Sequence, residues 1–477
     1  NDGTIGYQLS PFTDAFHTPR VNAGEANLGG TLFAQYLPGF YAKRQTYDDV
    51  IVAGNAVGGS NSFNKVTDNS ALLKTVAIYD GNTVDIEAKR VGFNAVHGLS
   101  KNQQAVGSAF EQVYGKLNPN KTTAFNQLVE GMFTLDDRDY GSFLDQLSGS
   151  QYAQQLQSVL LSLDPLNQTI NDRMDCNSNQ PARAVVNGSA TAQQVGCFSP
   201  NKAQTWVRVL GRWNENPGDA NAAGYEENQW GVWGGLDYAL NDNWFIGAAG
   251  GYFNSSMNFD QFGGINGNKI DYDGGQIAGY GGFDNAVWYD RAIVSAGFYS
   301  GTSNRSVTFH GSAVDPSGHP DADAVSFYNE AGRRFWLSSG DVLTPFVAVS
   351  VTNGQIDGFT ESDPHHTAAA LRIGDSSDTQ TSTLVGARVS STWGRFTPEV
   401  ALAWQHYFDT TVDVNATLVE APSGAKFKVT SSDIGSNGIF VDAGLGYAVG
   451  PSSDFSVRYI GQFLDNYDSN SVVGRFT

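Results

Sequence analysis

The stretch Trp230-Gly-Val-Trp-Gly-Gly-Leu-Asp-Tyr238 alternates bulky apolar residues with small or polar ones. A period of two places successive side chains on opposite faces of a β-strand. One face then carries Trp230, Val232, Leu236 and Tyr238. The same alternation occurs in Val400-Ala-Leu-Ala-Trp-Gln405 and in Phe455-Ser-Val-Arg-Tyr-Ile-Gly-Gln-Phe463. The pattern predicts strands, and it is found in soluble sandwiches as well as in membrane barrels.

Outward from this stretch, similar segments fill the chain from residue 206 to residue 477. About twelve strands are predicted, near 206–213, 228–240, 243–259, 268–284, 286–309, 322–339, 342–358, 371–390, 394–419, 425–447, 453–466 and 469–477. Short connections such as 241–243 alternate with longer polar ones such as 310–321. This asymmetry and the even strand number are typical of an outer-membrane barrel. Interfacial girdles are expected from Trp206, Trp213, Trp244, Trp288, Trp393, Trp404 and Tyr447.

The composition agrees with a large β protein. The 477 residues include 55 glycines and 12% aromatic residues, whereas charged residues make up only 16%. This composition is a poor match to a disordered chain, a coiled coil or a helical bundle. With 28 basic and 48 acidic residues the net charge is −20, and no basic run is present, so no nucleic-acid partner is expected. No apolar stretch is long enough to predict a membrane-spanning helix.

The first 175 residues show two further sequence patterns. Residues 1–93 predict short strands separated by turns, which suits a small sandwich or a few rungs of a β-helix. From residue 100 the pattern becomes helical, beginning with the capping box Ser100-Lys-Asn-Gln103 and continuing near 121–133, 139–147 and 152–163. Asp164 as N-cap and Pro165 as first helical residue predict a separate helix at about 165–175.

Two cysteines, Cys176 and Cys197, lie in the polar linker 176–203. They lack the spacing of a metal site. A disulfide between them would suit an oxidising compartment such as the periplasm, and two buried free thiols are the alternative. Thiol titration of the unreduced, denatured protein distinguishes the two. The first residues, Asn1-Asp-Gly-Thr4, do not form a signal peptide, so we expect a removed targeting segment or an internal fragment.

Several motifs, in this order and spacing, resemble the type Va autotransporter family. The end of an autotransporter passenger is resembled by the segment from Tyr79 to Phe93, which is followed by Leu99-Ser-Lys-Asn-Gln-Gln-Ala-Val106. It is also resembled by Leu147-Ser-Gly-Ser-Gln-Tyr152. The opening strands of the family's barrel are resembled by three further segments: Trp206-Val-Arg-Val-Leu-Gly211, Gly234-Gly-Leu-Asp-Tyr238 and Ile246-Gly-Ala-Ala-Gly-Gly-Tyr252. The resemblance extends from about residue 25 onward.

The resemblance implies a mostly β fold with three parts. Residues 1–99 would be the end of a right-handed parallel β-helix with the autochaperone region. Residues 100–203 would be a helical linker with a lumenal plug helix. Residues 204–477 would form a twelve-stranded antiparallel transmembrane barrel. The helix would carry Asp164, Pro165, Asn167, Gln168, Asn171, Asp172 and Arg173. A polar inner face would carry Arg208, Arg212, Asp237, Glu399, Gln405, Asp442 and Arg458.

The implied function is type V secretion, in which the barrel exports and anchors its own passenger at the surface of a Gram-negative bacterium without ATP, metal or cofactor. The implied partners are the passenger segment, outer-membrane lipid and lipopolysaccharide, the barrel-assembly machinery and periplasmic chaperones. The Cys-containing linker would lie on the periplasmic side. The last strand of the family normally ends on an aromatic residue, whereas this sequence ends Arg475-Phe-Thr477, so we expect it to be a few residues short.

Enzymatic chemistry finds little support in the motifs, and no enzyme is predicted. A barrel hydrolase would need residues such as Asp260, His310, Asp363 and His366, and the adjacent His365 and His366 are better explained as a solvated loop than as a metal site. Self-cleavage by cyclisation of Asn167 or Asn171 is a further alternative, although helix capping and lumenal hydrogen bonding are favoured. A diffusion porin with an N-terminal periplasmic domain is the main alternative function.

Overall fold

The alternating segments close into one antiparallel barrel in the computed structural model, which describes residues 3–13, 17–175, 184–186, 189–191, 203–261, 264, 267–285, 287–309, 312–338, 340–450 and 453–476. Twelve strands form its wall. They are β10 (Ala203–Asn216), β11 (Tyr225–Ala239), β12 (Trp244–Phe259), β13 (Lys269–Asp284), β14 (Trp288–Asn304), β18 (Ala322–Arg333), β20 (Val342–Ile356), β23 (Ser376–Ser390), β24 (Phe396–Tyr407), β27 (Asn437–Gly450), β28 (Ser453–Leu464) and β29 (Tyr467–Phe476). Neighbours in sequence pair throughout, and β10 pairs with β29 to close the ring.

The alternation sorts the wall into two faces. Outward side chains of β10, such as Val207 and Val209, are exposed, whereas the inward side chains of Arg208 and Arg212 are buried. The expected girdle residues Trp213, Trp244, Trp288, Trp393, Trp404 and Tyr447 are all exposed. Trp206 was wrongly assigned to the girdle. It shares the inward phase of Arg208, is 3% exposed, and donates a hydrogen bond from Nε1 to the Tyr280 hydroxyl at 2.9 Å.

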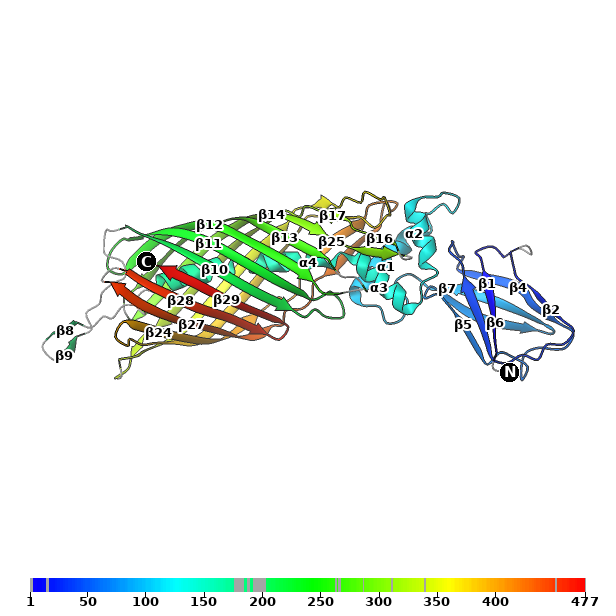
Figure 1. Ribbon diagram of the computed structural model, residues 1–477, viewed down its shortest axis with the longest axis horizontal. Coiled ribbons are helices and arrows are strands. Elements are labelled where there is room, and N and C mark those ends of the chain that lie inside the picture. Colours follow the sequence, from blue (N-terminus) through cyan, green and yellow to red (C-terminus); the bar gives the residue numbers. More distant parts are fainter. Residues whose placement is uncertain are drawn as a thin grey trace.

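The two rims differ, as predicted. Connections at one rim are short and comprise residues 240–243, 285–287, 334–341, 391–395 and 451–452. Those at the opposite rim comprise residues 217–224, 260–268, 305–321, 357–375 and 408–436, together with the tight turn 465–466. We call these the short-turn rim and the long-loop rim. The hairpin of β8 (Ala184–Val186) and β9 (Ser189–Thr191) lies beyond the short-turn rim, near the C-terminal end (Figure 1).

Several predicted strands were too long, because the alternation continues after the chain leaves the wall. The segments 371–390, 394–419 and 425–447 each divide into a wall strand and a loop strand. The loop strands are β15 (Val307–Phe309), β16 (Ser312–Val314), β17 (Ser317–Gly318), β21 (Phe359–Thr360), β22 (Leu371–Ile373), β25 (Asp413–Leu418) and β26 (Lys426–Thr430), and β19 (Phe335–Trp336) lies at the opposite rim. In β25 the alternating Val414, Ala416 and Leu418 remain buried, but the strand pairs with β22 and β26 instead of the wall.

Five helices precede the barrel in the described part of the chain: α1 (Lys101–Tyr114), α2 (Ala124–Met132), α3 (Asp137–Ser148), α4 (Ser150–Leu161) and α5 (Asp164–Met174). The capping box at Ser100 and Gln103 is present. Asp164 is the first residue of α5 and not its N-cap, which is Leu163. Residues 162 and 163 form helical turns, so α4 leads directly into α5. None of the described helices is both long and apolar enough to cross a membrane.

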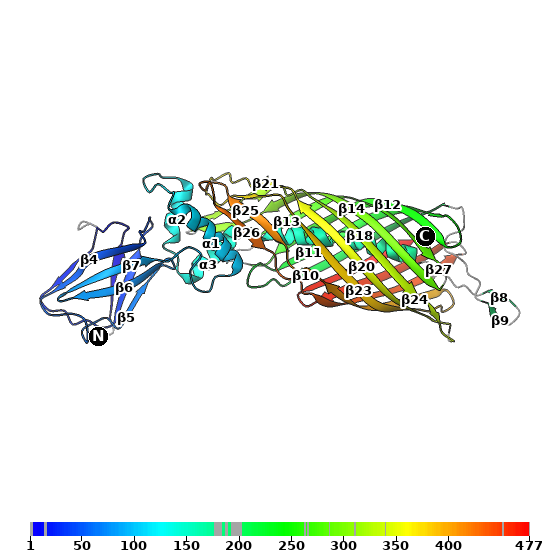
Figure 2. The same ribbon diagram turned by 180° about the vertical axis from the view of Figure 1, so that it is seen from behind.

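Helices α4 and α5 run through the interior of the barrel, and α1–α3 lie outside it at the long-loop rim (Figures 1 and 2). The lumenal helix is therefore longer than the predicted segment 165–175, because α4 is buried along its whole length. The buried residues of α4 include four glutamines, so the barrel lumen accommodates polar side chains on this helix.

The N-terminal strands form small sheets at the far end of the molecule (Figure 1). They are β1 (Thr4–Leu9), β2 (Val21–Ala23), β3 (Thr31–Tyr36), β4 (Arg44–Ala53), β5 (Lys65–Asp68), β6 (Leu73–Asp80) and β7 (Thr83–Arg90). The pairs β1–β3, β3–β5 and β2–β4 are parallel, which agrees with stacked rungs of a β-helix and not with an antiparallel sandwich. The antiparallel pairs β4–β7 and β6–β7 end the stack.

Candidate functional site in the barrel lumen

The lumen is occupied by a helix whose polar groups bond to the wall. All twelve residues of α4 are buried, including Gln151, Gln154, Gln155 and Gln157. Near the long-loop rim, Gln154 Nε2 donates to the backbone oxygen of Ala223, and Gln157 Nε2 donates to that of Thr410 at 2.9 Å. The glutamines thus supply the donors that the backbone carbonyls of the loops require when they are removed from water.

The middle of the lumen is held by hydroxyl groups. Ser158 donates to Glu227 and lies 2.7 Å from the Tyr272 hydroxyl. One turn further on, Ser162 Oγ is 2.8 Å from the Tyr299 hydroxyl. Arg212 donates to the backbone oxygen of Leu161 at 3.2 Å. These contacts come from both the wall and the helix, so they fix the height of the helix in the barrel.

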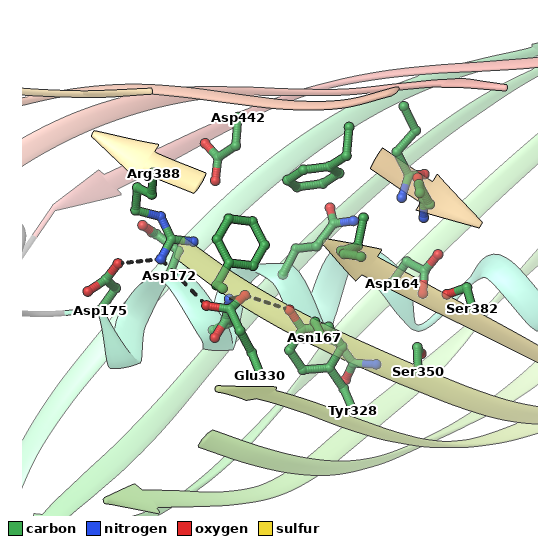
Figure 3. A pocket seen from close by; sticks show the side chains of 18 of the residues that line it. Asp164, Asn167, Asp172, Asp175, Tyr328, Glu330, Ser350, Ser382, Arg388 and Asp442 are labelled. Carbon is green, nitrogen blue, oxygen red and sulfur yellow. Dashed lines mark hydrogen bonds and ion pairs between the residues drawn. The ribbon is translucent and has the colours of Figure 1, made fainter. Parts of the chain in front are cut away.

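Helix α5 carries Asp172 and is capped at its C-terminal end by Asp175, and both aspartates are surrounded by arginines. Asp172 pairs with Arg208 and, at 2.7 Å, with Arg458. Asp175 lies 2.9 Å from Arg291 and 2.8 Å from Arg388. Figure 3 shows Asp175 facing Arg388, which is also directed toward Glu330.

The arrangement is reversed at Arg173, the one basic residue of α5. Its guanidinium lies 2.7 Å from Asp237 and 2.7 Å from Gln204 Oε1. The helix and the wall therefore have complementary charges, and a displaced helix would leave several buried charges without partners.

The structure places all seven residues of the predicted polar inner face in the interior. Arg208, Arg212, Asp237, Glu399, Gln405, Asp442 and Arg458 are each less than a tenth exposed. Arg458 joins three of the carboxylates, since it pairs with Asp442 at 2.7 Å and with Glu399 at 2.8 Å as well as with Asp172. Gln405 donates to the Tyr407 hydroxyl at 3.1 Å.

Sequence reasoning missed Asp175, Arg291, Glu330, Arg334 and Arg388 in this charge network, and it placed Asp172 on the polar lumenal helix without assigning it a partner. Arg291, Glu330 and Arg388 lie in the inward phase of β14, β18 and β23 and could have been found from the alternation alone. The two aspartates carry no such signal, because a short polar helix has the same composition on a protein surface.

The two lumenal asparagines have different surroundings. Asn167 is bonded on both sides, since Nδ2 donates to Ser326 at 3.2 Å and Oδ1 accepts from Ser295 at 2.8 Å. Asn171 Nδ2 donates to Glu330 at 2.9 Å, whereas its Oδ1 has no partner among the described residues. Asp164 and both asparagines line a cavity beside α5 (Figure 3).

The residues considered for a hydrolase are not brought into a catalytic arrangement by any described contact. Asp363 caps its own loop by accepting from the Thr367 backbone and hydroxyl, both at 2.7 Å. His310 lies outside the described residues, as do Cys176 and Cys197. Among the residues that the structure describes, no group of three or more His, Cys, Asp and Glu side chains could hold a metal ion.

The barrel belongs to a known class. The family model of the autotransporter beta-domain matches residues 205–460, which is more than half of the chain. This protein therefore belongs to the autotransporter β-domain family, and its barrel is an outer-membrane translocator for passenger export.

Two curated relatives are similar to this chain over nearly the same length. Both are named extracellular serine protease, from Serratia marcescens, and are 27% and 26% identical over 274 and 271 residues. The alignments cover 56% of this chain, which spans about a quarter of the length of each relative (25%).

Solved translocators have a similar barrel. The translocator domain of the autotransporter NalP from Neisseria meningitidis is matched over 69% of this chain and 95% of its own, with 10% identity and a TM-score of 0.48. The β domain of the Bordetella autotransporter BrkA is matched over 58% and 100%, with 18% identity and a TM-score of 0.40. The transport unit of AIDA-I from Escherichia coli is matched over 60% and 93%, with 12% identity and a TM-score of 0.38.

The translocator domain is not itself catalytic. The porin interpretation is less supported, since the family match is to a translocator and since α4 and α5 fill the lumen.

A buried carboxyl group lies outside the barrel, on α3. Asp145 accepts a hydrogen bond from Gln103 Nε2 at 2.9 Å, and its Oδ1 has no partner among the described residues. Burial raises the pKa of Asp145 to about 7, although the hydrogen bond from Gln103 opposes this shift. Its ionisation near neutral pH therefore acts against the folded helical segment.

We expect the substitution Asp175→Asn to destabilise the barrel with its helix. Arg291 and Arg388 would lose their shared counter-charge, and breaking a buried ion pair costs about 3–5 kcal/mol. The measurement is the free energy of unfolding in detergent, followed by tryptophan fluorescence. Gln168→Ala, on the same helix and only half-buried, is the control. An Asp175→Asn protein as stable as the control would contradict this role.

We expect the α1–α3 segment to become more stable as pH falls from 8 to 5. A carboxyl whose pKa is raised above its unfolded value of ~3.9 costs stability when it is ionised. This cost begins to fall as the pH drops below the folded-state pKa of about 7, keeps falling through pH 5, and is gone only below the unfolded pKa. Amide hydrogen exchange of α3 at the two pH values, corrected for intrinsic rates, measures the change. Asp145→Asn should abolish it, and an unchanged pH dependence in that variant would refute the assignment.

Proposed function

We propose that residues 1–99 are the end of a passenger, that residues 100–203 link it through the lumen, and that residues 204–477 form the translocator. In this proposal the long-loop rim and the N-terminal sheets face the cell exterior, and the short-turn rim faces the periplasm. The linker with Cys176 and Cys197 would then lie in the oxidising compartment.

One observation carries the proposal. The chain enters the barrel at the long-loop rim as α4, leaves it at the short-turn rim after α5, and returns into the wall as β10 at that same rim (Figures 1 and 2). A chain that was exported through this lumen would end in the same path. The contacts of Asp172, Arg173 and Asp175 then anchor the exported segment.

Folding outside the membrane can drive the last stage of export without a nucleotide. One aromatic core joins the N-terminal sheets to α1–α3 and consists of Phe93, Tyr114, Phe133 and Tyr140. In this core the Tyr140 hydroxyl donates to the Phe93 backbone oxygen at 2.6 Å. Burial of such apolar surface is favourable by about 25 cal/mol per Å². A chain that has folded in this way is too wide to return through the occupied lumen.

The proposal extends to partners. The exposed apolar side chains of the wall would contact lipid, and the acidic long loops would meet lipopolysaccharide phosphates through divalent cations. Insertion would require barrel-assembly machinery and periplasmic chaperones, as in the family. Although the two relatives are named as extracellular serine proteases, we assign residues 204–477 to export and not to hydrolysis.

We also propose that Asn167 and Asn171 anchor the helix and do not cleave the chain. Asn167 is held on both sides, since its Nδ2 donates to Ser326 and its Oδ1 accepts from Ser295, so the amide nitrogen is occupied. We expect Asn167→Asp and Asn171→Asp proteins to give the same fragment pattern as the native protein on a denaturing gel of outer membranes. A fragment of about the mass of residues 168–477 or 172–477 that one of these substitutions removes would instead establish self-cleavage.

Protease treatment of intact cells tests the topology. We expect loss of residues 1 to about 149, while α4, α5 and the barrel survive as one protected fragment, because these helices are buried in the lumen. Mass spectrometry of the protected fragment measures its first residue. Protection of the N-terminal sheets until the outer membrane is permeabilised would place them in the periplasm and favour the porin, which single-channel conductance would then test.

A further inference from the structure

A second contact surface closes the barrel above the lumenal helix. Residues 100–149, which we call the helical cap, lie against loop strands β15, β22 and β26 at the long-loop rim (Figures 1 and 2). The polar groups at this surface have partners on both sides, so neither side satisfies them alone.

Asn102 is the most connected residue of this surface. Its Nδ2 donates to the backbone oxygens of Asn221 at 2.9 Å and Thr430 at 2.8 Å, and its Oδ1 accepts from the Thr430 backbone at 2.9 Å. Its own backbone N–H donates to Asn221 Oδ1 at 2.8 Å. One side chain on α1 therefore joins two loops that are far apart in the sequence, and it is 1% exposed.

A buried ion pair lies beside the end of α3. Arg305 and Glu361 form a two-pronged pair, with 2.9 Å from Nε to Oε1. Arg305 Nη1 also donates to the backbone oxygen of Gln146 at 2.7 Å, and Tyr152 donates to Glu361 at 2.7 Å. The pair belongs to the loops, yet two of its remaining hydrogen-bonding positions are filled by the cap and the start of α4.

Apolar contacts complete the surface. The rings of Phe143 on α3 and Phe309 on β15 stack with centroids 4.6 Å apart. Gly149, between α3 and α4, has a φ of 64° and lies so close to Leu371 that a Cβ would be 2.5 Å from its Cδ1. The chain thus turns from the cap into the lumen directly against the loop sheet.

We propose that the long loops are a docking site for the helical cap, and that docking closes the barrel mouth and holds the passenger end in place. The proposal rests on the proposed topology, in which this rim is external. The docking site can be filled only when residues 100–149 have left the lumen and folded. Docking is therefore the closing step of export, and it opposes backward movement of α4 and α5.

Two substitutions in the full-length protein in lipid vesicles test the docking. Asn102→Ala removes the bonds to Asn221 and Thr430, and Phe143→Ala removes the stack on Phe309. We expect each to raise amide hydrogen exchange about tenfold in the cap and also in the loop strand that it contacts, since each variant loses a contact that joins the two sides. These strands are β26 (Lys426–Thr430) for Asn102→Ala and β15 (Val307–Phe309) for Phe143→Ala.

Matched controls lie within the cap. Asn126 is equally buried and also donates twice to backbone oxygens, those of Asn118 and Lys121. Phe125 stacks on Phe110 at 5.7 Å. Asn126→Ala and Phe125→Ala should raise exchange in the cap alone. Loop exchange that stays at the native rate in Asn102→Ala and Phe143→Ala, or that rises equally in the controls, would overturn the docking site.

The closure itself is measured by the rate at which the vesicles take up a small sugar. We expect uptake to rise in Asn102→Ala and Phe143→Ala but not in the controls, while the barrel keeps its heat-modifiable mobility on a gel. Uptake at the native rate in an undocked variant would overturn closure of the mouth. These measurements do not depend on which side of the membrane the cap occupies, so they fail independently of the cell-surface protease experiment.

Discussion

In hydrocarbon a backbone N–H or C=O without a partner costs several kcal/mol, and every strand of a spanning sheet must therefore be paired on both edges. The pairing of β10 with β29 meets this requirement, because it joins the first wall strand to the last. Closure then decides the rest of the architecture. The outward phase must be apolar, the inward phase surrounds an enclosed space, and any chain that leads into the wall from the opposite rim has to pass through that space.

The enclosed space is lined with charge, which is costly unless each charge is paired. The wall contributes Arg208, Arg291, Arg388 and Arg458, and α5 with its C-cap residue contributes Asp172 and Asp175. Buried pairs of this kind add little net stability over an apolar core, but breaking one is expensive. They therefore define one position of the helix more effectively than they raise total stability. Hydrophobic packing would tolerate a shift of the helix by one turn, whereas this network would not.

The sequence predicted the wall strands well, because the period-two alternation depends only on strand geometry and on the requirement that the outward face be apolar. The same rule failed for Trp206, where residue type was given more weight than phase. It also extended the strands at 394–419 and 425–447 too far, since alternation records which side is buried and not which strand is the partner. The inward Arg291 and Arg388 were within reach of the phase argument. Asp172 and Asp175 were not, because their importance depends on arginines more than a hundred residues distant, apart from Arg208.

The burial of the α4 glutamines also could not be predicted from the sequence. A helix with Gln151, Gln154, Gln155 and Gln157 has the composition of an exposed helix, yet all four are buried. The lumen accepts Gln154, Gln155 and Gln157 because loop carbonyls at Ala223, Pro320 and Thr410 need donors once the cap excludes bulk water. Each of these bonds has the amide as donor, and the side-chain oxygens of the four glutamines have no hydrogen-bond partners among the described residues. The amide of Gln151 has no hydrogen-bond partner among the described residues either. Neutral donors hold α4 against the loop carbonyls, whereas charge pairs hold α5 against the wall, so two kinds of interaction position a single lumenal helix.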